Sequence, residues 1–429
     1  MTDVHLWHPF ADMAYVPGHE VTLVSGEGSW VTDDRKRRYL DASASLWYCN
    51  VGHGRGELAD AAAAQMRRLA GYHTFDVFTN PPARELARRL TESPPTGPGS
   101  AAFFTSGGSE AVDTAAKLVR RYWEVCGQPR RRILVAREGA YHGMAAYGTS
   151  LAGIAPNRDG WGPLVREVVH VAADDPEALG DVVERHPGEV AGFFGEPVRG
   201  AGGVYPPPPG YWGRVQALCR EHDVLLVVDE VVTGFGRVGT DFGCARFEIA
   251  PDLVCLAKGI SSGYAPLGAV LSGARVREAL WSAGVGPIRH GYTYSGHPTA
   301  CAVGLANLDI LERENLPDRV RDLEPVLGDR LGPLAEHPLV EEVRAVGLLA
   351  GVELSASARA AAPDLTERVT RRARDHGVLV RNLLGHTLQI SPPFVITPEE
   401  LAHLAETLRT SLDGVAEELN ERPRTTRAT

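Results

Sequence analysis

Short apolar runs alternate with amphipathic stretches along the chain from about residue 100 onward. The apolar runs predict strands over residues 101–104, 132–136, 190–194, 224–229, 252–257 and 267–271. Apolar positions at helical spacing predict helices over residues 57–69, 109–123, 176–184, 211–221 and 298–311. This alternation is typical of βα units that feed a mostly parallel sheet, so we predict an α/β fold.

The pattern changes after about residue 315. A charged helix is predicted over residues 316–334, strand-like sequence over 343–354 and a second helix over 365–376. A hairpin-like pair follows at 377–381 and 388–390, and a final helix covers 398–419. These elements predict a separate, smaller α+β domain at the C-terminal end.

We therefore expect four parts. Residues 1–55 form an N-terminal segment that packs on the small domain and on the functional site, and residues 56–313 form a large domain. Residues 314–420 form the small domain, and residues 421–429, with almost no apolar side chains, form a disordered tail. A length of 429 residues suits two domains better than one core.

Charge and cysteine content narrow the class of protein. A formal net charge of −10 argues against a nucleic-acid partner, which would need basic clusters. The N-terminus has no basic start followed by an apolar core, and no run approaches about 18 apolar residues, so we expect no membrane contact and a cytoplasmic location. The six cysteines are scattered without a C-x-x-C pair, so we expect reduced thiols and no metal site.

Lysine is rare in this chain, which has only Lys36, Lys117 and Lys258 among 44 basic residues. Arginine stays charged and cannot form a Schiff base, so a retained lysine suggests a need for an amine. Lys258 follows a buried strand and opens an irregular loop, and ligands bind at such strand ends in parallel sheets. Lys258 is therefore the candidate reactive amine.

Two other patterns fit an amine at this place. The run Phe-Thr-Ser-Gly-Gly-Ser-Glu at 104–110 joins a strand to a helix, where free backbone amides can hold a phosphate. Asp229 ends the apolar strand 225–229, and a carboxylate there needs a cationic partner. A phosphate cradle, an acid for a ring nitrogen and a lysine together are what pyridoxal 5′-phosphate requires.

The motifs, taken in order, resemble those of the class III pyridoxal-phosphate-dependent aminotransferases. They are Phe-Thr-Ser-Gly-Gly-Ser-Glu-Ala at 104–111, Gly-Ala-Tyr-His-Gly at 139–143, Gly-Glu-Pro-Val at 195–198, Val-Asp-Glu-Val-Val-Thr-Gly-Phe-Gly-Arg at 228–237, Ala-Lys-Gly at 257–259 and Thr-Tyr-Ser-Gly-His-Pro at 293–298. Within the class the chain is most similar to ω-amino acid:pyruvate and amine:pyruvate transaminases. The resemblance implies a fold-type I transferase fold and a homodimer with shared active sites.

The resemblance also implies roles for single residues. Lys258 and Asp229 would be catalytic, with Lys258 forming the Schiff base. The implied cofactor contacts are Gly107, Gly108, Ser109, Tyr141, His142, Glu196, Asp229, Val231, Lys258 and, from the neighbouring subunit, Thr293. The implied substrate pocket consists of Phe10, Trp47, Tyr48 and Phe75, with Arg381 binding a carboxylate at the end of the strand 377–381. Asp76 follows Phe75 directly in the sequence. If its side chain faces the pocket, it would favour a substrate with a distal cationic group; the alternative is an ordinary surface carboxylate.

We therefore expect a transaminase that moves an amino group from an amine or ω-amino acid to a keto acid such as pyruvate by a ping-pong mechanism. The diaminopelargonate-forming (adenosylmethionine-8-amino-7-oxononanoate) aminotransferases are an alternative suggested by Trp7-His-Pro, although Phe10 and Leu46 depart from the tyrosine and tryptophan expected there. An aminomutase or a decarboxylase on the same scaffold also remains open, and the sequence does not name the physiological amine.

Overall fold

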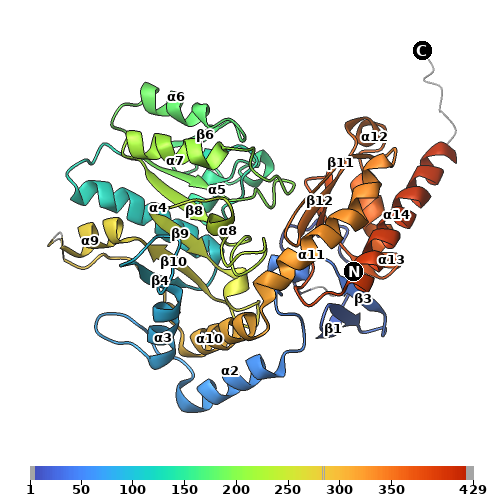
Figure 1. Ribbon diagram of the computed structural model, residues 1–429, viewed down its shortest axis with the longest axis horizontal. Helices are drawn as coiled ribbons and strands as arrows, with labels where there is room; N and C mark the ends of the chain where they lie inside the picture. The colour runs from blue at the N-terminus through green and yellow to red at the C-terminus, as the bar shows by residue number, and fades with distance from the viewer. Residues whose placement is uncertain (1–4, 283, 285, 422–429) are drawn as a thin grey trace.

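The computed structural model describes residues 5–282, 284 and 286–421 of the chain. Figure 1 shows a large unit built around one sheet and a smaller unit that holds the C-terminal helices. Of the tail predicted to be disordered, only Glu421 is described, as the last residue of a helix, and the rest lies outside the described residues. No helix in the described part of the chain is long and apolar enough to cross a membrane.

The large unit contains a seven-stranded sheet with the order β4-β10-β9-β8-β7-β5-β6. Its strands are β4 (Ala101–Thr105), β5 (Ile133–Arg137), β6 (Val168–Val171), β7 (Val190–Gly195), β8 (Leu225–Asp229), β9 (Leu253–Leu256) and β10 (Gly268–Ser272). Strand β10 runs antiparallel to both of its neighbours, and the other pairs are parallel. The predicted mostly parallel α/β sheet is thus confirmed, and β6 is an edge strand that the apolar pattern did not indicate.

Helices cover both faces of this sheet, which explains why its strands are continuous apolar runs. Leu225 and Val227 pack with α4 (Gly108–Val125) and α9 (Ala274–Ser282), whereas Leu226 and Val228 pack with α6 (Glu177–Arg185) and α7 (Tyr211–Glu221). The remaining helices of the unit are α2 (Gly56–Leu69), α3 (Pro81–Leu90), α5 (Ala146–Leu151), α8 (Gly243–Arg246) and α10 (Pro298–Arg313), with 3-10 turns η1 (Ala155–Asn157) and η2 (Lys258–Ile260).

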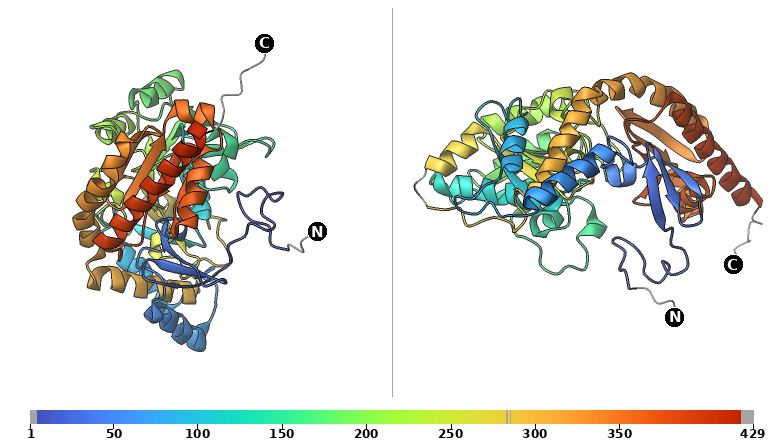
Figure 2. Two further views of the ribbon diagram at one scale, coloured as in Figure 1. Left: turned by 90° about the vertical axis from the view of Figure 1, so that its right-hand side faces the viewer. Right: turned by 90° about the horizontal axis from the view of Figure 1, so that it is seen from below.

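The smaller unit contains an antiparallel sheet with the order β11-β12-β15-β14. Its strands are β11 (Val340–Val346), β12 (Leu349–Leu354), β14 (Arg381–Leu383) and β15 (Thr387–Ile390). Its helices are α11 (Leu316–Leu331), η3 (Gly332–Glu336), α12 (Ala356–Ala361), α13 (Leu365–Asp375) and α14 (Pro398–Glu421). Figure 2 shows the blue N-terminal strands beside this unit, with α14 on its outer side.

The N-terminal strands β1 (Leu23–Glu27), β2 (Trp30–Asp33) and β3 (Arg38–Asp41) form a third sheet, which β13 (Val378–Leu379) completes in parallel with β3. The predicted hairpin is therefore only partly right. Residues 378–379 pair with the N-terminal sheet, and Arg381 begins β14, which pairs with β15, instead of ending one longer strand. The chain changes sheets between these two short strands.

Arg237 joins the units at their common boundary. Its guanidinium is fully buried and donates to the carbonyl oxygens of Leu348 (3.0 Å) and Pro392 (2.6 Å) and to the side-chain oxygen of Asn50 (2.8 Å). It also lies over the Phe394 ring, 4.6 Å from the centroid. No carboxylate pairs with Arg237 among the described residues, and burial lowers its pKa to about 9. The large unit, the small unit and the turn after β3 meet on this one side chain.

Candidate active site

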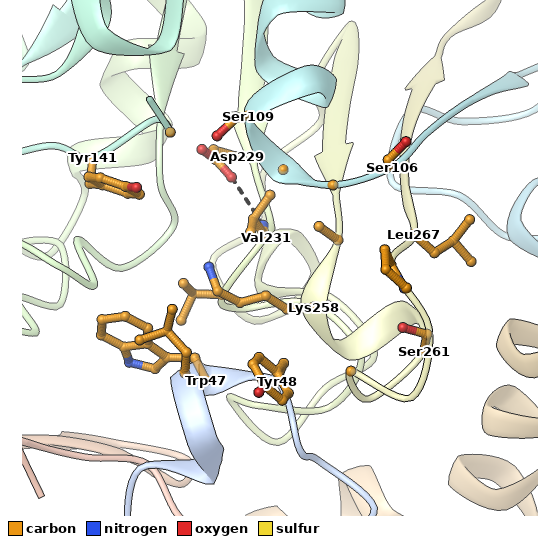
Figure 3. Close-up of a pocket in the computed structure, with 18 of the residues that line it drawn as sticks. Trp47, Tyr48, Ser106, Ser109, Tyr141, Asp229, Val231, Lys258, Ser261 and Leu267 are labelled. Carbon is orange, nitrogen blue, oxygen red and sulfur yellow. Dashed lines mark hydrogen bonds between the residues drawn. The ribbon is translucent and has the colours of Figure 1, made fainter. Parts of the chain in front are cut away.

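A cavity lined by Lys258, Asp229, Glu196 and other polar side chains lies at the carboxyl ends of β8 and β9. The cavity has a volume of about 380 Å³. Its walls come from the loops after these strands, from the start of α4 and from the short helix α1 (Ala44–Trp47). Figure 3 shows Lys258 between Trp47 and the segment that carries Asp229 and Val231.

Asp229 occupies the end of β8 and is only 6% exposed. Its Oδ2 atom lies 2.9 Å from Nδ1 of His142, and its Oδ1 atom accepts a hydrogen bond from the backbone N–H of Val231 (3.1 Å). The carboxylate is therefore held from two sides while it still lines the cavity. Since each carboxylate oxygen can accept more than one bond, Asp229 can receive a further donor from a ligand.

Lys258 lies where β9 ends and η2 begins, with its backbone in the left-handed region (φ 47°). Burial lowers the pKa of its amine to about 8, although Asp229 and Glu196 act in the opposite direction. The amine lies 5.6 Å from the ring centroid of Trp47. A pKa near 8 means that a sizeable part of the amine is neutral, and therefore nucleophilic, at neutral to mildly alkaline pH.

The first turn of α4 points its backbone amides at the cavity. Gly107 is the N-cap residue and no side chain caps the turn, so its N–H groups are available to an anion. The backbone needs glycine here, because a Cβ atom on Gly108 would lie 3.1 Å from the Val231 side chain. Ser109 also lines the cavity, and its hydroxyl accepts the backbone N–H of Met144 (3.1 Å).

Glu196 holds the loop that carries Tyr141. Its two oxygens accept the backbone N–H groups of Tyr141 (3.0 Å) and Gly200 (2.9 Å). Burial raises the pKa of this carboxyl. Tyr141 is half-buried and lines the cavity, where burial also raises its pKa. Glu196 thus fixes an aromatic ring at the cavity wall.

Trp47 and Tyr48 enter the cavity from an unusual turn. Ala44, Ser45 and Trp47 all have positive φ angles, a conformation that is costly for residues other than glycine. The buried carboxylate of Asp41 stabilises this turn. It accepts hydrogen bonds from the backbone N–H of Ser45 (2.7 Å) and from the backbone N–H and the hydroxyl of Ser43. The strained backbone is what directs Trp47 toward Lys258.

Arg381 reaches the same region from β14 in the small unit. Its guanidinium lies over the ring of Trp47, 4.8 Å from the centroid. Burial lowers its pKa, and the nearby Tyr141 hydroxyl acts in the opposite direction. Its charge also lowers the pKa of Lys258. Arg381 is therefore a partly buried cation at the edge of the site, without being one of the residues that line the cavity.

Eleven of the predicted site residues line one cavity: Trp47, Tyr48, Gly107, Gly108, Ser109, Tyr141, His142, Glu196, Asp229, Val231 and Lys258. Phe10, Phe75 and Thr293 do not line it, and all three are exposed. Asp76 is also exposed and outside the cavity. Phe75 packs beside the segment that precedes Thr293, because a Cβ atom on Gly291 would be 3.2 Å from the Phe75 ring.

Some features of the site carried no signal in the sequence. Leu46, Ser106, Ser261 and Leu267 also line the cavity. Ser106 lies within the run 104–110 that predicted a phosphate site but was not given a contact of its own, and no motif marks the other three as site residues. The contact of His142 with Asp229 joins residues 87 positions apart, and only the fold reveals it.

Comparisons with known proteins match nearly the whole chain. Residues 13–412 match the family model described as aminotransferase class-III. The chain is 37% identical to a putrescine–pyruvate aminotransferase of Pseudomonas aeruginosa, over 96% of this chain and 95% of that protein. It is also 37% identical to an adenosylmethionine-8-amino-7-oxononanoate aminotransferase of Geobacter sulfurreducens, over 96% of each chain.

Solved structures give the same picture. The crystal structure of a thermostable (S)-enantioselective omega-transaminase from Thermomicrobium roseum superposes with a TM-score of 0.91. The two sequences are 39% identical, and the alignment covers 96% of each chain.

Proposed function

We propose, from the premise that this chain belongs to the class III aminotransferases, that it uses pyridoxal 5′-phosphate to transfer an amino group from an amine or ω-amino acid to a keto acid such as pyruvate. The observation that carries this proposal is the meeting, in one cavity, of the Lys258 amine, the Asp229 carboxylate and the start of α4. These are the groups that such a cofactor needs for its aldehyde, its ring nitrogen and its phosphate.

The residues present fit the cofactor. The uncapped amides of α4, with Gly108 and Ser109, would hold the phosphate. Asp229, with an acceptor site left over after its two protein contacts, would hold the ring nitrogen. Tyr141 and Val231 offer ring and aliphatic surfaces for the flat ring. When bound, pyridoxal 5′-phosphate supplies a ring that takes up the negative charge left on a carbon atom when its proton is removed.

Lys258 has the properties of the proton-transferring group. Its amine is buried, its pKa is about 8, and general bases work best when their pKa lies near the working pH. The neutral amine can accept a proton at Nζ, and Asp229 stabilises the resulting ammonium charge. The Trp47 ring lies on one side of the amine, 5.6 Å from its centroid.

Arg381 is proposed to select the acceptor. A guanidinium binds a carboxylate through two parallel hydrogen bonds, which suits a keto acid. In the structure Arg381 rests on Trp47, so it borders the same space that an uncharged amine would use. Recognition of a diamine or an ω-amino acid is supported by the name of the Pseudomonas aeruginosa relative. The adenosylmethionine-8-amino-7-oxononanoate aminotransferase activity named for the equally similar Geobacter sulfurreducens relative is the second candidate.

We further infer a homodimer in which each chain completes its partner's site. Thr293 and Phe75 are predicted site residues that are exposed and lie outside the cavity of their own chain, and Phe75 packs beside Gly291, two residues before Thr293. Apolar side chains near them in the sequence are also exposed, namely Tyr72 (48%), Val77 (80%), Phe78 (48%) and Tyr294 (64%), and the rings of Tyr72 and Phe78 contact each other. Several large apolar side chains exposed in two segments that pack beside each other support an interface there.

The test is a panel of amines and ω-amino acids supplied with pyruvate, with alanine formation measured by chromatography. Putrescine and 4-aminobutyrate with pyruvate test the first candidate function. Adenosylmethionine with 8-amino-7-oxononanoate, without pyruvate and followed by formation of the diamino product, tests the second. Lys258→Ala should abolish turnover, whereas the surface variants Lys36→Ala and Lys117→Ala should retain it. Normal turnover by Lys258→Ala would refute the proposed chemistry, and turnover only with adenosylmethionine would favour the second candidate.

A further inference from the structure

The turn that carries Lys258 is strained and buried, so something must hold it. Lys258 has a φ angle of 47°. A residue with a side chain takes this left-handed conformation only when the surrounding structure imposes it. The 3-10 turn η2 contains just three residues, and its Gly259 and Ile260 are fully buried. Their carbonyl oxygens therefore need partners that water cannot supply.

Asn307 on α10 supplies both partners. Its side-chain amide nitrogen donates to the carbonyl oxygen of Gly259 (2.9 Å) and to that of Ile260 (3.2 Å). Asn307 is 0% exposed, and its side-chain oxygen has no hydrogen-bond partner among the described residues. Both N–H bonds of the amide are thus used on the two residues that follow Lys258, and the amide supplies these two donors without adding a charge to the buried turn.

The packing brings α10 close enough for this contact. Gly304, one turn before Asn307, lets the helix approach, because a Cβ atom there would lie 3.0 Å from the Leu267 side chain and 3.5 Å from the Ile260 carbonyl oxygen. On the opposite side of the turn, a Cβ atom on Gly259 would lie 2.9 Å from Phe235. The turn is confined between α10 and the loop after β8, and Asn307 makes the directional contacts.

We propose that Asn307 is a positioning residue that holds the backbone of the Lys258 turn and thereby fixes the place of the reactive amine. The inference rests on the proposed function of Lys258 as the reacting lysine. Asn307 does not touch the cavity, so its effect on the reaction passes through Gly259 and Ile260. Without it, the two carbonyl groups lose their partners and the left-handed turn can relax, which moves the amine and admits water.

The position of the amine can be measured without turnover. The full chain, freed of cofactor by dialysis against an amine donor, is trace-labelled with isotopic acetic anhydride at a series of pH values. Peptide mass spectrometry then gives the labelling midpoint of each lysine, and the exposed Lys36 and Lys117 serve as internal references. In the unaltered chain the midpoint of Lys258 should lie at about 8. Asp229, Glu196 and Arg381 face this amine and are unchanged in every variant.

Asn307→Leu keeps the size of the side chain but removes the donor. We expect the Lys258 midpoint to rise by about one pH unit, as water reaches the amine, with about tenfold less neutral amine at pH 7. The matched control is Ile310→Val, a buried change on the same helix that should leave the midpoint in place. Asn307→Ser, which retains one donor, should give a smaller rise and carries the test if Asn307→Leu does not fold.

An unchanged Lys258 midpoint in a folded Asn307 variant, with a loss of thermal stability no larger than that of the control, would overturn the inference. An equal rise in the Ile310→Val control would also overturn it, because any disturbance of α10 would then suffice. The result is independent of transamination. If Lys258→Ala turned over normally while the Asn307 variants shifted the midpoint, the proposed function would be refuted and the positioning role of Asn307 would stand.

Discussion

Nδ1 of His142 lies 2.9 Å from Oδ2 of Asp229, and both side chains are buried. The imidazole ties the carboxylate to the loop after β5, while the backbone N–H of Val231 binds the other oxygen. Asp229 therefore cannot rotate freely, and its charge is presented to the cavity in one orientation. This relationship makes Asp229 the first residue to test.

Asp229→Asn should impair proton transfer far more than it impairs cofactor binding, because the phosphate contacts at α4 remain while the ring nitrogen loses its counter-charge. The loss in kcat should be about 10²-fold or more, corresponding to the ~3 kcal/mol typical of removing one partner of a buried charge pair. Equilibrium dialysis of the cofactor and initial rates measure the two effects. Asp174→Asn, a change at the partly exposed partner of Arg199, is the control. Wild-type rates in Asp229→Asn would require another acid at the ring nitrogen.

The pKa of Lys258 predicts how fast the cofactor-free chain captures pyridoxal 5′-phosphate covalently. Only the neutral amine attacks a carbonyl carbon, and burial lowers the pKa from 10.5 to about 8. The capture rate should therefore rise about tenfold per pH unit below this value and level off above it. Borohydride reduction at timed points, followed by mass spectrometry, gives the rate. A profile that keeps rising to pH 10 would show that the amine is not desolvated.

A subunit-exchange experiment tests the shared site. Lys258→Ala and Thr293→Ala chains are mixed under conditions that exchange subunits. In a mixed dimer one site has Lys258 and an intact Thr293 from the other chain, and the second site has neither. Activity should exceed that of either parent and approach about a quarter of the wild-type value, since half of the dimers are mixed and each has one working site. No recovery after exchange has been verified by native mass spectrometry would mean that each chain builds its site alone.

Arg381→Ala should separate the two half-reactions. Pyruvate and carboxylated donors should lose ~1.5–3 kcal/mol of transition-state binding, which is typical of a charge-assisted hydrogen bond. An uncharged amine does not use this contact, so its half-reaction, followed by cofactor absorbance before any acceptor is added, should change little. Arg371→Ala, an exposed pair with Glu367, is the control. Equal damage to both halves would instead assign Arg381 a role in the fold, through its contact with Trp47.

The sequence predicted best those site residues whose position follows directly from where a strand ends. Asp229 and Lys258 each follow a buried apolar run, and the ends of neighbouring parallel strands must lie at the same edge of the sheet. Gly107 and Gly108 stand out for a similar reason, because a glycine pair between a strand and a helix leaves the amides free.

The rest depends on contacts between distant parts of the chain. Strand β6 is an edge strand with a polar His170 and partial exposure, so its apolar pattern is weak. The change of sheets between Leu379 and Arg381 depends on the neighbours β3 and β15, which the local sequence does not reveal. The surface position of Phe75 likewise follows from its packing against residue 291.

The contacts of Arg237 also set an order of events during synthesis. Asn50, Arg237 and Pro392 are separated by most of the length of the chain, yet they share one buried guanidinium. While the ribosome is still translating the region before Pro392, β8 and β9 can already pair. The guanidinium of Arg237 still lacks one of its hydrogen-bond acceptors at that stage, because the carbonyl oxygen of Pro392 has not yet been made. The Trp47 turn, which neighbours Asn50, then has its contacts with Asp41 but not yet those with Ser391, which donates to the carbonyl oxygens of Ala42 and Ser43. The cavity therefore matures only after the C-terminal strands emerge, and a nascent or truncated chain presents an uncovered charge and apolar surface to chaperones and proteases.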